Sequence, residues 1–222
     1  MIKAVIFDMY ETLITHYNCP VYFSQEMAED AGVAVEKFMP AWKETEEDRW
    51  VGKYTFEETV ADIMKDAGCY SEEKLNLIFE KRMATKRECF RHLHEGVIPM
   101  LEELKRREIK IGLISNCFSE EVTAIRESVL FPYFDKACLS YEEQLQKPDP
   151  EIFHRCMDGL GVKPEECLYI GDGGCQELET AKKVGMHPLQ ACWYFQEWIR
   201  HQTRRNPEFE QLDAPMDVMK FL

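Results

Sequence analysis

The feature that most constrains the fold is a short apolar run that ends in an aspartate. Residues 2–7 read IKAVIF, are rich in β-branched and aromatic side chains, and lead directly into Asp8. A nearly continuous apolar strand is typical of a parallel sheet that is covered by helices on both faces. The run therefore predicts an α/β fold and places Asp8 at the carboxyl end of a strand, where open α/β sheets bind their ligands.

The sequence after Gly96 alternates between strand and helix patterns. The expected strands cover residues 110–114, 137–139, 167–170 and 187–191. The expected helices cover residues 99–107, 119–127, 150–160 and 177–184. This alternation indicates βαβ crossovers and a parallel sheet. Residues 193–222 show no clear pattern, and we interpret the basic cluster at 200–205 as a solvated surface.

The region between the first strand and Gly96 has a different texture. It is strongly charged and carries apolar residues at three- and four-residue spacing, which is typical of amphipathic helices. The expected helices cover residues 21–31, 40–50, 56–67 and 72–91. Because the first strand belongs to the later sheet, we predict a Rossmann-like core, with helices on both faces of a parallel sheet, over residues 1–15 and 95–222. An inserted α-helical cap would cover residues 16–94.

Charge and composition exclude several classes of function. The 222 residues include 41 acidic and 27 basic side chains, which gives a net charge of −14. Nucleic acids and anionic membranes both bind basic surfaces, so neither is an expected partner. The sequence shows neither an apolar run long enough to span a membrane nor a signal peptide, and its nine cysteines form no CxxC pair. We therefore expect a cytoplasmic protein with free thiols.

Polar side chains follow three of the expected strands. Asp8 follows the first, Ser115 and Asn116 follow the second, and Asp172 follows a later one, while Lys147 lies in a loop that leads to a helix. Two carboxylates can hold an oxygen-loving cation such as Mg²⁺. Lys147 can balance their charge and bind a substrate anion, and Asp8 can attack the substrate to form an ester that water hydrolyses. The sequence therefore predicts a site for a small anionic substrate despite the net negative charge.

These residues belong to four ordered motifs, which resemble those of the haloacid dehalogenase-like (HAD) hydrolase superfamily. The motifs are FDMYETL at residues 7–13, a strand that ends in Ser115-Asn116, Lys147-Pro148 before a helix, and Gly171-Asp172 with an acid at Glu177. They span most of the chain. The helical insertion is similar to the family's small cap over a Rossmann-like core.

The resemblance implies a role for each motif residue in the metal and nucleophile site. Asp8 would be the nucleophile and a ligand of Mg²⁺. Tyr10 would offer its backbone carbonyl to the metal, and Thr12 would orient the loop. Asp172 would be a further metal ligand, with Glu177 supporting it.

The resemblance also implies a set of substrate-binding residues. Ser115 and Lys147 would bind the transferred phosphoryl group, with Asn116 beside them. In the expected cap, Arg49 is a candidate for pairing with a carboxylate or phosphate, and Lys53 is a weaker candidate of the same kind. For each of these two cap residues the alternative is a solvent-facing position on a helix.

The first motif departs from the usual phosphatase pattern at Tyr10. Phosphatases of this superfamily usually carry a second Asp there, which protonates the leaving group and activates water. Tyrosine has an ordinary pKa near ~10 and is a poor base at neutral pH. The 2-haloacid dehalogenases carry Tyr at this position, but Asp172 in the fourth motif indicates a metal site that they do not need. The favoured hypothesis is Mg²⁺-dependent hydrolysis of a small phosphorylated metabolite; the alternatives are a dehalogenase and a catalytically weak binding protein.

Overall fold

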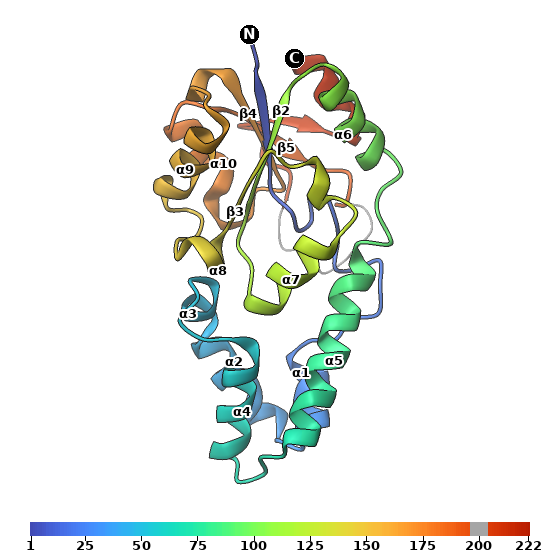
Figure 1. The fold of residues 1–222 in the computed structure, drawn as a ribbon, viewed down its shortest axis with the longest axis vertical. Helices are drawn as coiled ribbons and strands as arrows, with labels where there is room; N and C mark the ends of the chain where they lie inside the picture. Colours follow the sequence, from blue (N-terminus) through green and yellow to red (C-terminus); the bar gives the residue numbers. More distant parts are fainter. Residues whose placement is uncertain (196–203) are drawn as a thin grey trace.

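The first strand, β1 (Ala4–Phe7), lies in the middle of a six-stranded parallel sheet, as its apolar sequence predicts. A computed structural model describes residues 1–195 and 204–222 (Figure 1). The strand order is β3-β2-β1-β4-β5-β6. The other strands are β2 (Lys110–Ser115), β3 (Lys136–Leu139), β4 (Cys167–Gly171), β5 (His187–Ala191) and β6 (Glu210–Leu212). The expected α/β class and the four expected later strands are confirmed, whereas β6 was not expected.

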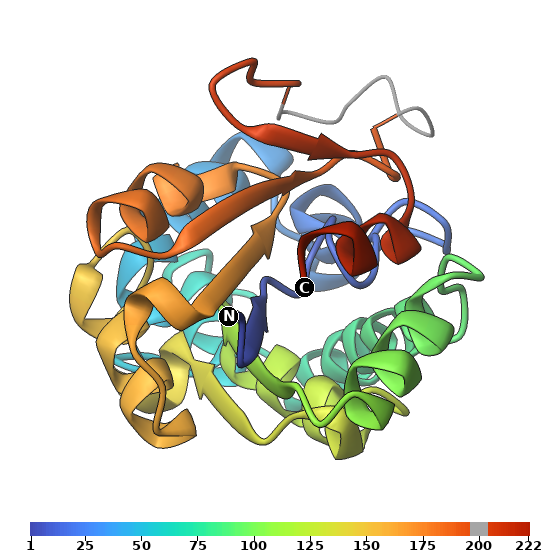
Figure 2. The ribbon, with the colours of Figure 1, turned by 90° about the horizontal axis from the view of Figure 1, so that it is seen from above.

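Alternate side chains of β1 pack into two separate hydrophobic clusters, one on each face of the sheet. Val5 and Phe7 contribute to the cluster that includes residues of α6 (Val97–Arg106) and α7 (Ser119–Glu127). Ala4 and Ile6 contribute to the cluster that includes α9 (Pro150–Leu160) and α10 (Glu177–Lys183). Figure 2 shows these two pairs of helices on opposite sides of the strands. The sheet is therefore covered on both faces, and this explains why its first strand is apolar throughout.

Five helices between β1 and α6 form a body at one end of the sheet (Figure 1). They are α1 (Ser24–Ala31), α2 (Val35–Glu44), α3 (Glu46–Trp50), α4 (Phe56–Asp66) and α5 (Glu72–Cys89). This helical region has a hydrophobic cluster of its own, which includes Met27, Phe38 and Ile78. Its side chains therefore bury one another rather than packing onto the sheet.

One expected helix in this region was wrong. The stretch 40–50 does not form a single helix that begins at Pro40; α2 begins at Val35, runs through Pro40 and ends before α3. A proline inside a helix deprives the carbonyl four residues earlier of its hydrogen bond. Pro40 and Glu36 are both exposed, so water can reach that carbonyl.

The remaining elements are short. They are α8 (Ser140–Glu143) and the 3₁₀ turns Phe131–Tyr133, Pro164–Glu166, Gly174–Gln176 and Pro215–Phe221. No helix among residues 1–195 and 204–222 combines the length and apolar character of a membrane span. Most of the basic cluster that the sequence places at 200–205 lies outside the described residues.

Candidate functional site

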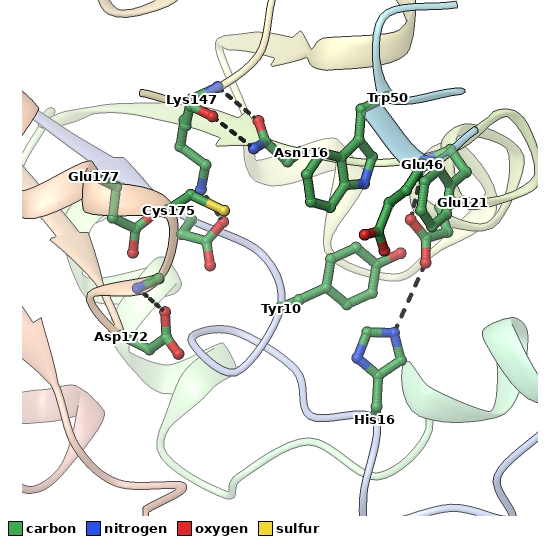
Figure 3. A pocket seen from close by; sticks show the side chains of 13 residues that line it. Tyr10, His16, Glu46, Trp50, Asn116, Glu121, Lys147, Asp172, Cys175 and Glu177 are labelled. Carbon is green, nitrogen blue, oxygen red and sulfur yellow. Dashed lines mark hydrogen bonds and ion pairs between the residues drawn. The ribbon is translucent and has the colours of Figure 1, made fainter. Parts of the chain in front are cut away.

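Three carboxylates meet at the carboxyl ends of two neighbouring strands. Asp8 follows β1, Asp172 follows β4, and Glu177 begins α10. One oxygen from each of these side chains lies within 4.8 Å of the others, and all three residues are buried. Figure 3 shows Asp172 and Glu177 on one side of a cavity, with Lys147 beside them. The structure therefore brings together four residues that the motifs singled out separately.

Lys147 connects two of these carboxylates. Its Nζ atom donates to Asp8 Oδ1 at 2.5 Å and to Glu177 Oε2 at 2.5 Å, and the side chain is 4% exposed. Glu177 Oε2 also accepts a hydrogen bond from the Tyr169 hydroxyl at 2.9 Å. Although burial opposes its positive charge, Asp8 and Glu177 raise the pKa of Lys147 above its usual range. Lys147 is therefore held as an ammonium ion within the site.

The charges of this group do not balance. The four side chains carry three carboxyl groups and one ammonium. Lys147 pairs with Asp8 and Glu177, and Asp172 Oδ1 accepts a hydrogen bond from the Gly174 N–H at 2.9 Å. Burial raises the pKa of Asp8 to about 7, with Lys147 opposing the shift and Glu177 adding to it. A buried excess of negative charge is costly unless a cation is bound. The donor set consists of carboxylate oxygens, which suit Mg²⁺, so these residues fit the metal that the sequence predicts.

Two glycines allow the backbone to approach Glu177. A Cβ atom on Gly171 would lie 1.9 Å from Glu177 Oε1, so a larger residue would collide with that carboxylate. Gly173 has a φ of +99°, which favours glycine, and its N–H donates to Glu177 Oε1 at 3.1 Å. Glu177 thus accepts hydrogen bonds at both oxygens, from Gly173 at one and from Lys147 and Tyr169 at the other. Glu177 therefore contacts Lys147, Tyr169 and the Gly173 backbone.

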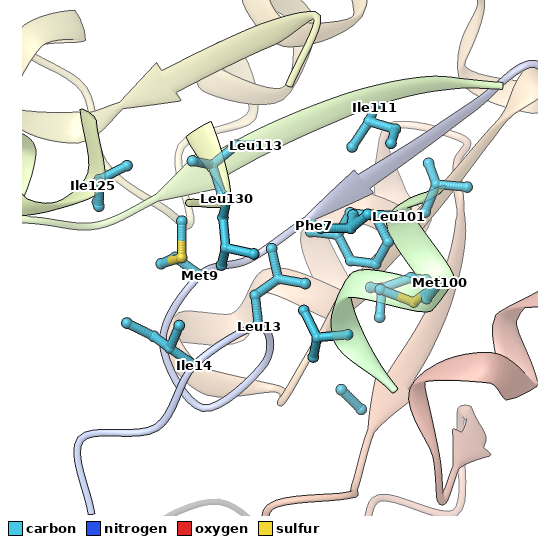
Figure 4. Packing of buried hydrophobic residues seen from close by; sticks show 14 of the residues in the cluster. Phe7, Met9, Leu13, Ile14, Met100, Leu101, Ile111, Leu113, Ile125 and Leu130 are labelled. Carbon is cyan, nitrogen blue, oxygen red and sulfur yellow. The ribbon is translucent and has the colours of Figure 1, made fainter. Parts of the chain in front are cut away.

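Buried apolar side chains hold the loop that carries Asp8 against the hydrophobic core. Met9, Leu13 and Ile14 are fully buried in the cluster on the α6 and α7 face of the sheet (Figure 4). The Thr12 hydroxyl donates to Asp8 Oδ2 at 3.3 Å. Asp8 is therefore held by packing on one side and by polar contacts on the other.

Two aromatic residues that the sequence did not single out also hold this loop. Trp193 Nε1 donates to the Thr12 carbonyl at 2.8 Å, and the Tyr194 hydroxyl donates to the Leu13 carbonyl at 3.3 Å. Both follow β5 and lie in the stretch that shows no clear sequence pattern. In each of these hydrogen bonds the donor and the acceptor are 181 residues apart in the chain, so no pattern in the local sequence could predict it.

Asn116 and Ser115 occupy different positions, although they are adjacent. The Asn116 amide donates to the Lys147 carbonyl at 3.0 Å and accepts from the Lys147 N–H at 2.8 Å, so it fixes the backbone that carries the lysine. Asn116 also lines the cavity. Ser115 is fully buried, and its hydroxyl lies 3.5 Å from the Asn116 carbonyl. Ser115, at the end of β2, is not among the residues that line the cavity.

The two cap residues proposed for substrate binding do not line this cavity. The Arg49 guanidinium is stacked between the Trp42 and Phe118 rings, at 3.5 and 4.4 Å from their centroids, and donates to the Trp42 carbonyl at 2.7 Å. Arg49 is 1% exposed, so neither a substrate-pairing position nor the alternative of a solvent-facing one describes it. Lys53 is exposed and pairs with Asp48 at 2.5 Å. Stacking on aromatic rings therefore holds Arg49 behind the wall of the cavity.

Tyr10 lies between the carboxylate group and a second set of charged residues (Figure 3). Its ring stacks on His16 with centroids 4.4 Å apart, and its hydroxyl is buried without a hydrogen-bond partner among the described residues. Burial raises the pKa of Tyr10 well above its ordinary value, with Glu121 adding to the shift. Tyr10 is therefore a neutral phenol and cannot act as a base at neutral pH.

The second set of charges, which the sequence did not reveal, connects α5 with α7. Lys86 Nζ lies 2.5 Å from Glu121 Oε1 and 2.8 Å from His16 Nε2. Arg82 donates to Glu120 at 3.1 Å. Charged residues on helices are usually solvated, so nothing in the local sequence marks these as buried.

The carboxylate group opens into a cavity of about 240 Å³. Besides Asp8, Lys147, Asp172 and Glu177, the cavity is lined by Tyr10, His16, Glu46, Trp50, Asn116, Phe118, Glu121, Gly174 and Cys175. Helix α3 and the residues around α7 supply the wall opposite the carboxylates. The helical region thus contributes directly to the site.

Known proteins are similar to this chain in sequence. A family model described as haloacid dehalogenase-like hydrolase matches residues 2–185. The glyceraldehyde 3-phosphate phosphatase of Methanopyrus kandleri is 26% identical over 99% of this chain and 96% of its own length. The "Rhythmically expressed gene 2 protein" of Drosophila melanogaster is 43% identical, but over 39% of this chain and only 34% of its own length.

Solved structures share the fold. A 2-haloacid dehalogenase from Pseudomonas syringae has a TM-score of 0.71 at 21% identity and covers 99% of this chain and 97% of its own. An enzyme of the HAD family from Bacteroides thetaiotaomicron, in complex with magnesium and inorganic phosphate, has a TM-score of 0.62 at 20% identity, covering 86% of this chain and 94% of its own. At such identities the likeness concerns the fold alone.

Proposed function

The chain belongs to the haloacid dehalogenase-like hydrolase family, and we propose that it is a Mg²⁺-dependent phosphatase whose nucleophile is Asp8. The observation that carries the proposal is the meeting of three buried carboxylates, Asp8, Asp172 and Glu177, with one oxygen of each within 4.8 Å of the others. A halocarboxylate brings a further negative charge and no cation, whereas a phosphoryl group is transferred together with Mg²⁺. The phosphatase relative that matches the whole chain supports the same choice.

In this proposal Asp8 and Asp172 hold the metal, with the Tyr10 carbonyl as a third ligand. When bound, Mg²⁺ would neutralise charge on the transferred phosphoryl group. One Asp8 oxygen attacks phosphorus, the P–O bond to the alkoxide breaks, and the alkoxide takes a proton from water. Water then hydrolyses the aspartyl phosphate to the Asp8 carboxylate and inorganic phosphate. Lys147 offsets the negative charge of the phosphoryl oxygens, together with Asn116.

We assign Glu177 a role other than the support of Asp172 that the resemblance implies. Both of its oxygens accept hydrogen bonds, one of them from Lys147 at 2.5 Å, so we assign it to holding Lys147 in place. Ser115 supports the loop from within the protein and is not assigned to phosphate binding through its side chain, because it is fully buried. The helical region, which lines the cavity through Glu46 and Trp50, acts as the cap.

The test is phosphate release from a panel of phosphate monoesters, with Mg²⁺ or with excess EDTA. We expect turnover in Mg²⁺, loss of turnover in EDTA, and no turnover by the Asp8→Asn variant. Absence of turnover above that variant on every ester would overturn the proposal. Tight ligand binding without turnover would instead identify a binding protein on the same scaffold.

The second candidate function is 2-haloacid dehalogenation, which Tyr10 favours because the general acid of phosphatases is missing at this position. Its buried hydroxyl and raised pKa make it a neutral side chain in contact with the cavity. Chloride release from 2-chloropropionate in excess EDTA would establish this activity. Its absence, together with Mg²⁺-dependent phosphate release, would exclude it.

A further inference from the structure

The catalytic cavity continues into a larger one. A second cavity of about 930 Å³ lies between the sheet and the helical region, and it shares His16, Glu46, Trp50, Phe118 and Glu121 with the first. The transferred phosphoryl group is small and belongs beside Asp8 and Lys147. The second cavity is therefore where the rest of a substrate would lie. A three-carbon phosphate would leave most of it unfilled.

The wall of the second cavity is rich in aromatic surface. Phe23 and Trp42 line it together with the shared residues Trp50 and Phe118. The Trp50 ring is stacked on Phe118, with centroids 5.9 Å apart and an interplanar angle of 13°. Figure 3 shows Trp50 next to Tyr10, between the Lys147 side of the site and the Glu121 side. Flat rings prefer to stack on such surfaces, and each aromatic pair adds specificity beyond simple burial.

The charges in this cavity are largely neutralised by the protein itself. Two of its cations, Arg82 and Lys86, are buried and already paired with Glu120 and Glu121 at 3.1 and 2.5 Å. Lys43 is exposed at the rim and Glu46 carries the opposite charge. A second phosphate or a carboxylate on the substrate would therefore find no buried cation available among the lining residues described. A neutral group avoids the cost of burying an unpaired charge.

We propose that the substrate is a phosphate monoester of a neutral alcohol that carries an aromatic ring, with the ring stacked against Trp50 in the second cavity. This inference rests on the proposed phosphatase function and narrows its substrate class. It predicts discrimination against pyrophosphate and against phosphorylated sugar acids. It also predicts discrimination against short polyol phosphates, which lack a ring.

The experiment compares three phosphate monoesters with similar leaving-group chemistry: benzyl phosphate, 4-carboxybenzyl phosphate and glycerol 1-phosphate. All three are primary alkyl esters, so differences in kcat/KM report binding of the alcohol part. We expect benzyl phosphate to exceed each of the other two by about tenfold or more with the Mg²⁺-loaded full chain. An equal or higher value for glycerol 1-phosphate or 4-carboxybenzyl phosphate would overturn the inference.

Substitution of Trp50 tests the position of the ring. Trp50→Leu keeps an apolar side chain but removes the flat face, so we expect KM for benzyl phosphate to rise about tenfold more than KM for glycerol 1-phosphate. Trp50→Phe should recover most of the loss. Tyr54→Leu is the matched control, because Tyr54 is 44% exposed and lies outside both cavities.

The outcomes separate this inference from the function on which it rests. Turnover of any of the three esters in Mg²⁺, absent in EDTA, supports the phosphatase function whichever ester is preferred. Trp50→Leu could instead lower kcat/KM equally for all three esters at an unchanged melting temperature. That result would show that Trp50 does not contact the alcohol part of the substrate. It would overturn this inference but not the phosphatase function. No turnover of any ester would overturn both.

Discussion

Two groups of buried charges lie on either side of Tyr10, and they differ in how their charges balance. On the sheet side, Asp8, Asp172 and Glu177 lie together, and one lysine, Lys147, pairs with Asp8 and Glu177. On the side of the helical region, Arg82 and Lys86 of α5 face Glu120 and Glu121 of α7, two cations against two carboxylates. The first group has an excess of negative charge, and the second is neutral.

The difference separates a binding site from a structural connection. Although burial alone raises the pKa of Glu121, Lys86, His16 and Arg82 hold it well below its usual range, so the folded protein stabilises this carboxylate. Asp8 shows the opposite behaviour, because burial prevails over its single lysine and raises its pKa to about 7. Lys86, His16 and Arg82 thus stabilise the Glu121 carboxylate without a ligand, although burial raises the pKa of Glu120 beside it. The three carboxylates around Asp8 instead form the donor set of a candidate cation site.

The largest expected effect concerns the unbalanced group. Asp8→Asn removes the proposed nucleophile and should lower kcat for any phosphate substrate on the order of 10⁴-fold. It also removes one of three crowded carboxylates, so stability in EDTA should stay the same or rise. Phosphate release and denaturation by urea in EDTA measure the two effects. A loss of several kcal/mol in stability would contradict the contrast drawn between the groups.

The next effect concerns the balanced group. Glu121→Gln leaves Lys86 buried without its carboxylate, and breaking such a buried pair costs about 3–5 kcal/mol of unfolding free energy. The control is Glu127→Gln on the same helix, because Glu127 pairs with Arg87 at 2.7 Å but both side chains are about half exposed. That change should cost at most about 1 kcal/mol. Equal losses in urea denaturation would show that burial does not distinguish the two pairs.

A smaller effect is expected from adding metal. Mg²⁺ at about 100 times its dissociation constant should stabilise the folded chain by about 2.7 kcal/mol, since the unfolded chain holds no preformed site. The gain should disappear in Asp172→Asn and persist in Glu121→Gln, relative to each variant in EDTA. Thermal unfolding with and without Mg²⁺ measures it independently of activity. If Mg²⁺ still stabilised the Asp172→Asn variant, Asp172 would not be a ligand of the metal.

The smallest effect concerns the residue that positions Lys147. Asn116→Ala removes the two hydrogen bonds to the Lys147 backbone and should lower kcat about tenfold, or about 1.4 kcal/mol of transition-state stabilisation. The stabilisation by Mg²⁺ should not change, because Asn116 is not a proposed ligand. Steady-state kinetics and thermal unfolding check the two expectations. A lost magnesium response would mean that the substitution disturbs the whole site.

The features that the sequence predicted are those that depend on residues close together in the chain. The strands β1, β2, β4 and β5 and the positions of Asp8 and Asp172 at their ends follow from local apolar runs and the rule for parallel sheets. β6 was missed because its three residues, Glu210–Leu212, form a short and mostly polar edge.

The contacts that complete the site could not be predicted in the same way. The pairing of Lys86 with Glu121 and the stacking of Arg49 on Trp42 join residues from different helices or separate turns. Each of these side chains has the local signature of a solvated helix surface. Only the three-dimensional packing of the helical region shows which of them are buried.

The hydrogen bonds from Trp193 and Tyr194 to the loop after Asp8 have a consequence for biosynthesis. A ribosome makes the loop after Asp8 well before the donors that hold it, which come 181 positions later than their acceptors. A nascent chain that has already produced β1 to β4, Lys147 and Asp172 still lacks these two clamps. The proposed nucleophile is thus synthesised before the residues that fix its loop, so a chain without them would present an acidic loop that is not yet held in place.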